Sequence, residues 1–139
     1  MKSIVFVKRV PATTTQVRVK DGTALDPTSV EFELNPYDEF AVEEALQQKE
    51  KSEDGSVTVV SFGTTETRKE LLAALAKGAD QALLLESDLA PTTDGLTTAS
   101  ILANAIREQD FDLVFLGKQA VDHDQHGVGP AVATLLGIP

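Results

Sequence analysis

The sequence contains no cysteine. This absence excludes disulfides, zinc ribbons, iron–sulfur ligation and thiol nucleophiles, and it fits a reducing compartment. Any redox role of this chain must therefore depend on a bound cofactor.

Positive charge is scarce. Twelve Lys and Arg residues stand against 22 Asp and Glu residues, which gives a net charge of −10 at pH 7. The field of such a chain repels phosphate backbones and anionic membranes, so we expect no nucleic-acid partner.

Long apolar runs are also missing from the N-terminus. The run from Ile4 to Val7 is followed at once by Lys8 and Arg9, and it is too short for a signal peptide or a transmembrane helix. We therefore expect no direct insertion into a membrane, and a location in the cytoplasm, or in the mitochondrial matrix if the source is eukaryotic.

The remaining composition is that of a globular domain. With 139 residues, 42% hydrophobic and 24% charged, the chain has the size of one domain and is not disordered. We expect a single α/β nucleotide-binding domain over residues 1–139.

Apolar runs and helical periodicities alternate along the chain. Buried parallel strands are predicted near residues 3–7, 56–61, 82–86 and 113–117. Helices are predicted from Asn35-Pro36 to near Lys51, from Gly63 to Gly78 with Leu71, Leu72 and Leu75 on one face, after Pro91 with Ala99, Leu102, Ala103 and Ile106 on one face, and from near Val128. This order predicts a doubly wound, mainly parallel Rossmann-like sheet with the first strand in its interior.

Two further features concern the ends of these elements. Period-two alternation at residues 16–20 and 30–34 predicts two short strands, a β excursion after the first strand. The last predicted helix is followed by no strand, where a doubly wound sheet normally continues. We therefore expect a chain truncated relative to the full fold.

Ligands of an open parallel sheet bind at the carboxyl ends of its strands. The loops there are residues 8–11, 62–65, 86–88 and 117–127. The last is the richest, because its glycines free the backbone, Lys118 adds a cation, and the helix near Val128 directs its N-terminal N–H groups at a phosphate. These features favour an adenine nucleotide.

Other interpretations of the same residues are less specific. The Asp and His residues at 122–126 suggest a metal site, but their spacing does not define a coordination geometry, so we expect none. Residues 35–38 could simply be a helix cap. The sequence has no Gly-x-Ser-x-Gly, Walker or Gly-x-Gly-x-x-Gly motif, so we expect no catalytic side chains.

Four blocks of sequence carry a family resemblance. In order and spacing, the chain resembles the beta subunit of the electron-transfer flavoproteins at Val7-Lys8-Arg9-Val10, at residues 35–45, at Ala76-Lys77-Gly78-Ala79-Asp80 and at residues 116–122. The resemblance runs from Met1 to Pro139, and the family's beta subunit is longer.

The resemblance implies one half of a heterodimer that acts in fatty acid oxidation. Alpha and beta subunits of that family together hold one FAD, accept electrons from flavin dehydrogenases such as acyl-CoA dehydrogenases, and pass them to a membrane quinone oxidoreductase. The beta subunit is an electron carrier without catalytic side chains of its own. It also binds AMP, or a second FAD in electron-bifurcating relatives.

The resemblance also implies which residues bind that nucleotide. They are Phe6, Lys8, Asn35, Pro36, Tyr37, Asp38, Phe62, Gly63, Gly117, Lys118, Gln119, Asp122, Asp124, His126, Gly127, Val128 and Gly129. The chain departs from the family at residues 123–127, where Gly127 occupies a position that is usually Gln.

Two other classes of protein use similar folds. A stand-alone adenine-nucleotide-binding regulator of the universal-stress-protein type carries a Gly-rich phosphate loop before its last helix, and residues 124–129 lack that spacing. An adenylate-forming hydrolase needs a Ser-Gly-Gly motif near the first strand, and residues 11–15 do not supply one.

Overall fold

A four-stranded parallel sheet forms the centre of the molecule. The computed structural model describes residues 1–16 and 18–139. The sheet has the order β7-β6-β1-β8, and every pairing in it is parallel. Its strands are β1 (Lys2–Phe6), β6 (Ser56–Gly63), β7 (Gln81–Glu86) and β8 (Leu113–Leu116). The predicted parallel sheet with an interior first strand is confirmed.

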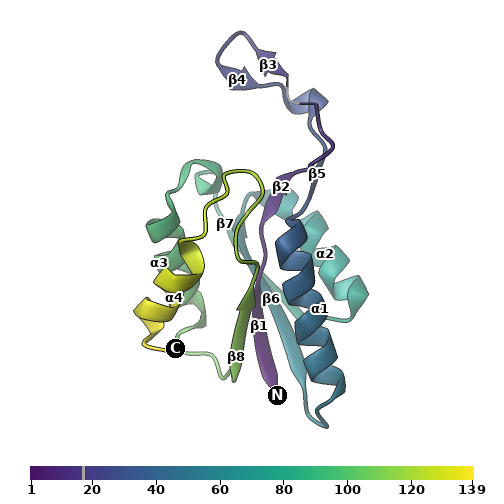
Figure 1. The fold of residues 1–139 in the computed structure, drawn as a ribbon, viewed down its shortest axis with the longest axis vertical. Coiled ribbons are helices and arrows are strands. Elements are labelled where there is room, and N and C mark those ends of the chain that lie inside the picture. Colours follow the sequence, from purple (N-terminus) through teal and green to yellow (C-terminus); the bar gives the residue numbers. More distant parts are fainter. Residues whose placement is uncertain (17) are drawn as a thin grey trace.

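Helices cover both faces of this sheet (Figure 1). One face packs against α1 (Pro36–Glu50) and α2 (Arg68–Lys77), and the other against α3 (Gly95–Ile106) and α4 (Val128–Leu136). Val5 of β1 belongs to the first core, whereas Ile4 and Phe6 belong to the second, because neighbouring strand residues point to opposite faces. The doubly wound Rossmann-like fold is therefore confirmed.

The outer strands and α2 differ from expectation in their burial. In the described part of the chain, β7 and β8 lie at the sheet edges, so Ala82 and Leu113 are exposed where buried strands were predicted. Leu72 is 62% exposed, whereas Leu71 is buried. Adjacent helical residues are turned about 100° from each other, so Leu72 points away from the face that Leu71 presents to the sheet.

The excursion after β1 forms an arm that extends beyond the carboxyl end of the sheet (Figure 1). At its base, β2 (Arg9–Pro11) pairs antiparallel with β5 (Phe32–Leu34). At its tip, β3 (Val19–Lys20) pairs antiparallel with β4 (Ala24–Leu25), and the 3-10 turn η1 (Pro27–Ser29) follows.

The two strands predicted in this excursion are both too long and need correction. The second is confined to β5, whose partner is β2. Of the first, Val19 and Lys20 form β3, and residues 16 and 18 belong to no strand, whereas residue 17 lies outside the described residues. The first strand is short because of the turn at Asp21 and Gly22. Both residues have positive φ, and the turn folds β3 back onto β4, which follows it directly.

Candidate functional site

A cavity of about 780 Å³ opens at the carboxyl end of the sheet. It lies where the strand order reverses, between β1 and β8, and the ends of β1, β6 and β8 contribute to its wall. The loop 117–127, the start of α4 and the base of the arm complete most of the remaining lining. This is the position at which open α/β sheets bind their ligands, and the volume is typical of small-molecule sites.

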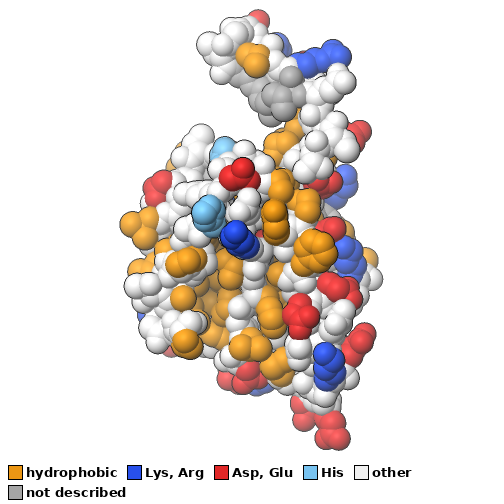
Figure 2. Space-filling model, in the orientation of Figure 1, with side chains coloured by type: hydrophobic (Ala, Val, Ile, Leu, Met, Phe, Trp, Pro, Cys, Tyr) orange, Lys and Arg blue, Asp and Glu red, His pale blue; other side chains and the backbone are white. Residues whose placement is uncertain are grey.

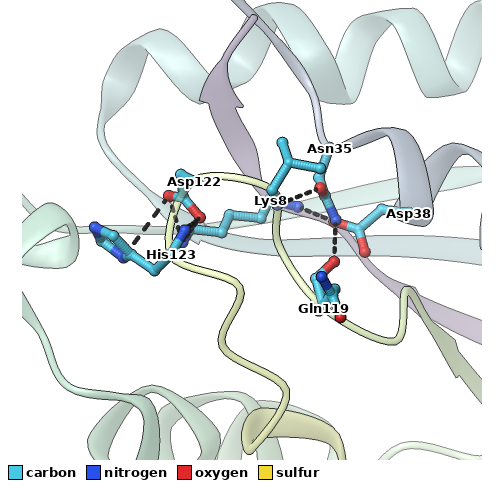
Figure 3. Close-up of polar contacts among 7 residues, drawn as sticks. Lys8, Asn35, Asp38, Gln119, Asp122 and His123 are labelled. Carbon is cyan, nitrogen blue, oxygen red and sulfur yellow. Dashed lines mark hydrogen bonds and ion pairs between the residues drawn. The ribbon is translucent and has the colours of Figure 1, made fainter. Parts of the chain in front are cut away.

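Asn35 connects the start of α1 to this loop. The residue is 1% exposed. The amide Nδ2 donates to the carbonyl of Gln119 at 2.9 Å, and Oδ1 accepts from the N–H of Val121 at 3.1 Å (Figure 3). Asn35 holds the N-cap position of α1, yet its side chain makes no capping bond. The helix-cap interpretation is therefore right about the position of Asn35 at the start of α1. Its side chain, however, binds the loop after β8 and not the helix.

Asp38, in the first turn of α1, connects the ends of the two central strands. It is 5% exposed, and its carboxylate accepts from the N–H of Lys8 at 2.8 Å and from the N–H of Gly117 at 2.9 Å. Burial raises the pKa of Asp38 to about 6. The backbone N–H groups, the Asn35 amide and the Lys8 ammonium act in the opposite direction, and desolvation outweighs them.

Gly117 is required by this close approach of α1 to the end of β8. A Cβ atom at position 117 would lie 2.6 Å from Cβ of Tyr37 and 2.7 Å from the Tyr37 carbonyl carbon, and it would overlap Oδ1 of Asp38. Real Cβ atoms do not make contacts this short. The glycine therefore allows the loop to leave β8 directly against the first turn of α1.

The two lysines near the cavity differ in their surroundings. Lys8 Nζ lies 2.7 Å from Oδ2 of Asp122, whose side chain is 13% exposed. Lys118 is exposed and lines the cavity. Figure 2 shows histidine, basic and acidic side chains close together over the loop between β8 and α4. Because Lys8 and Asp122 neutralise each other, Lys118 is a cation available to an anionic ligand in this loop.

The second half of the loop is braced from within. Asp124 has a φ of 50°, and its Oδ1 accepts from Nε2 of Gln119 at 2.8 Å. The loop ends at α4, whose first N–H groups have no intrahelical acceptor and lie at the cavity through Val128 and Gly129. The predicted phosphate-facing helix terminus is thus at the cavity wall.

Most of the residues proposed for nucleotide binding line this cavity. They are Phe6, Lys8, Asn35, Asp38, Phe62, Gly63, Gly117, Lys118, Gln119, Asp122, His126, Val128 and Gly129. Four do not line it, namely Pro36, Tyr37, Asp124 and Gly127. The shared location brings these residues together, and their contact with a nucleotide remains a prediction.

One wall of the cavity was not anticipated. It consists of the 3-10 turn η3 (Ala90–Thr92) and the start of α3, through Pro91, Thr93, Gly95 and Thr98. The loop 86–88, one of the four loops expected at the site, does not line the cavity, and Glu86 accepts a hydrogen bond from Thr65 at 2.6 Å. Small neutral residues of this kind give no sequence signal of a ligand site. The one signal in this segment is Asp94, the N-cap of α3, which indicates where that helix begins.

A second unanticipated contribution comes from the base of the arm. Arg9 stacks over the ring of Phe32 at 3.9 Å from its centroid, and both line the cavity. The Arg9 Nε also lies 3.3 Å from a carboxylate oxygen of Glu70, which is 4% exposed. The antiparallel pair of β2 and β5 therefore adds an aromatic and a cationic surface next to the strand ends.

Metal sites and membrane spans are two other features that bear on function. Between residues 1–16 and 18–139, no group of three His, Asp or Glu side chains is placed to hold a metal ion. In the same ranges, no helix is both long and apolar enough to cross a membrane.

The fold and the cavity define a doubly wound α/β domain with a ligand site at its topological switch point. A sequence profile of the family described as "Electron transfer flavoprotein domain" matches residues 23–139. The chain therefore belongs to the electron transfer flavoprotein domain family, which confirms the resemblance found in its sequence.

Individual relatives agree with this assignment. The chain is 41% identical over 138 residues to "Electron transfer flavoprotein subunit beta" of Bradyrhizobium diazoefficiens, covering 99% of this chain and 55% of the relative. It is 40% identical over 141 residues to the protein of the same name from Bacillus subtilis, covering 100% and 54%. A mitochondrial relative from Arabidopsis thaliana is 39% identical over 140 residues, covering 100% and 55%. The chain thus spans about half the length of these relatives.

Proposed function

We propose that this chain is the nucleotide-binding domain of an electron-transfer flavoprotein beta subunit. The observation that carries the proposal is the cavity at the switch point, in a chain that belongs to this family. Its loop 117–127 and the start of α4 offer backbone N–H groups and the exposed ammonium group of Lys118, which are the groups that bind a phosphate.

In this proposal the cavity takes AMP as a structural ligand. Its phosphate lies against the N-terminus of α4 near Val128 and Gly129, with Lys118 beside it, and its adenine lies near Phe6 and Phe62. The structure is compatible with this fit: the volume of about 780 Å³ falls within the range of small-molecule sites. The carboxylate of Asp122 is neutralised by Lys8 and does not oppose an anion.

The partner of the domain is an electron-transfer flavoprotein alpha subunit, with which it holds FAD. That flavin supplies the electron-transfer chemistry. The chain contributes a folded surface and a bound adenine nucleotide, and no catalytic side chain. Electrons come from flavin dehydrogenases, for example acyl-CoA dehydrogenases, and pass to a membrane quinone oxidoreductase. The support for these roles is the family and the name "subunit beta" that the relatives carry.

Family membership also separates this proposal from the alternatives. A universal-stress-type regulator or an adenylate-forming hydrolase would share the sheet topology without matching the electron transfer flavoprotein profile over residues 23–139.

The decisive experiment identifies what the protein carries. Purified protein is denatured, and the released small molecules are identified by mass spectrometry, with absorbance near 450 nm measured before denaturation. AMP in stoichiometric amount, without flavin absorbance, is the expected result. Stoichiometric FAD from the chain alone would mean that the cavity holds the second flavin of bifurcating relatives in place of AMP. The absence of any nucleotide would contradict the proposed site.

A second experiment tests the partner. The chain is co-expressed with the alpha subunit from the same source, and the complex is isolated through a tag on the alpha subunit. We expect co-purification in a one-to-one ratio with bound flavin. Recovery of the alpha subunit alone, with this chain folded and soluble in the same extract, would contradict the assembly.

A further inference from the structure

We propose that Asn35 and Asp38 are positioning residues, whose buried side chains hold the loop 117–127 in its ligand-accepting shape. The inference rests on the proposed function for the identity of the ligand. Its structural part concerns the protein alone and stands on four hydrogen bonds to backbone groups.

The four backbone groups come from segments far apart in the chain. Asp38 binds the N–H groups of Lys8 and Gly117, which follow β1 and β8. Asn35 binds the carbonyl of Gln119 and the N–H of Val121, within the loop. The first turn of α1 thus connects the two strands that flank the switch point and the first part of the loop to one helix.

These side chains direct their polar atoms to backbone groups of the chain. Each oxygen of Asp38 accepts one backbone N–H, and both polar atoms of the Asn35 amide are engaged. With exposures of 5% and 1%, neither presents much surface to the cavity. Pro36 and Tyr37, which lie between them in sequence, do not line the cavity at all.

An ion pair extends the same attachment. The backbone of Lys8 is held by Asp38, and the ammonium group of Lys8 in turn holds Asp122 at 2.7 Å. The loop is therefore fastened at positions 117, 119, 121 and 122. A loop that is held in advance avoids the ordering cost that binding would otherwise impose.

The fold does not depend on these bonds for the placement of α1. That helix is held by Ala41, Val42, Ala45 and Leu46, which are buried in the core beside β1 and β6. Loss of the polar bonds is therefore expected to loosen the loop while the helix stays packed.

The test uses Asp38→Asn and Asp38→Ala, with Glu39→Gln as the matched control. Asp38→Asn keeps the shape and one acceptor oxygen, whereas Asp38→Ala removes both. Glu39→Gln removes a carboxylate from the same helical turn, and its side chain is 51% exposed. Asn35→Ala tests the second residue. Circular dichroism and the thermal midpoint establish that each variant is folded.

The first measurement is amide hydrogen exchange without nucleotide. We expect one of the Gly117 and Lys8 amides to exchange about tenfold faster in Asp38→Asn and both of them in Asp38→Ala, since bonds to charged acceptors have this order of strength. The Val121 amide responds in the same way to Asn35→Ala. In Glu39→Gln all three amides exchange as in the unaltered protein. Unchanged exchange in Asp38→Ala and Asn35→Ala would overturn the proposal.

The second measurement is calorimetric titration with AMP. A positioning role predicts weaker AMP binding only in variants whose loop exchanges faster, because affinity falls with the population of the competent loop. Weaker AMP binding with unchanged loop exchange would mean direct contact with the nucleotide and would overturn the proposal. If the unaltered protein binds no AMP, the proposed ligand is wrong, while the exchange measurement still decides the positioning role.

Discussion

The clearest quantitative prediction concerns the pH dependence of stability set by Asp38. Burial raises the pKa of this carboxyl from 3.8 to about 6. The folded state therefore binds more protons than the unfolded state between these two pH values, and the free energy of unfolding must fall as the pH rises through that window. Below pH 3.8 the contribution is fully present, and above about 6 it is lost.

The magnitude follows from the size of this shift. A difference of about 2.2 pH units at 1.36 kcal/mol per unit corresponds to about 3 kcal/mol. Because Asp38 is 5% exposed, solvent screening reduces this value little. Asp38→Asn has no group that titrates there, so the difference in stability between the two proteins isolates this one carboxyl from the other acids.

The assay is urea unfolding of the unaltered protein, Asp38→Asn and Glu39→Gln at several pH values between 4 and 8. We expect Asp38→Asn to gain about 2–3 kcal/mol relative to the unaltered protein as the pH rises across this range. The amide side chain in Asp38→Asn cannot accept one of the two hydrogen bonds, which adds a difference in stability that is the same at every pH. Only the change of the stability difference with pH therefore tests the raised pKa of Asp38. A difference between the two proteins that stays constant with pH would refute the reasoning, as would an equal slope for Glu39→Gln.

Other predictions concern the same loop. Gly117→Ala places a methyl group against Tyr37, and we expect a loss of about 2 kcal/mol or more in urea unfolding together with weaker AMP binding; full retention of both would contradict the close approach. Lys118→Met weakens AMP binding modestly, with a loss that shrinks as salt is added, and calorimetry at two ionic strengths checks this. Lys8→Met leaves Asp122 unpaired beside the proposed phosphate site and weakens AMP binding more, whereas Lys8→Met combined with Asp122→Asn restores part of the loss; a purely additive pair of effects would count against their coupling.

Local patterns were sufficient to predict the architecture. The runs of Val, Ile and Leu predicted all four strands of the sheet, and Asn35-Pro36 and Gly78 predicted where α1 begins and α2 ends. Alternation of strands with helices then predicted the parallel order, and with it the end of the sheet where a ligand site belongs. Each of these features depends on residues a few positions apart.

Local patterns failed where burial depends on neighbours from elsewhere in the chain. The run at residues 113–116 predicted a buried strand, yet β8 borders the described sheet on one side, and Leu113 is exposed. The arm shows the same limit. Alternation indicated strands at residues 16–20 and 30–34, but the choice of β2 as the partner of β5 depends on the path of the chain in space.

The sequence by itself determined which end of the sheet carries the site and which loop dominates it, because both follow from periodicity and from the turn residues of the chain. Only the tertiary structure decided what Asn35 and Asp38 do. Their partners in the loop lie 79 to 86 residues further along the chain and meet them only because β8 pairs with β1. Capping preferences describe a residue and its helix, whereas these hydrogen bonds join elements that only the folded sheet brings together.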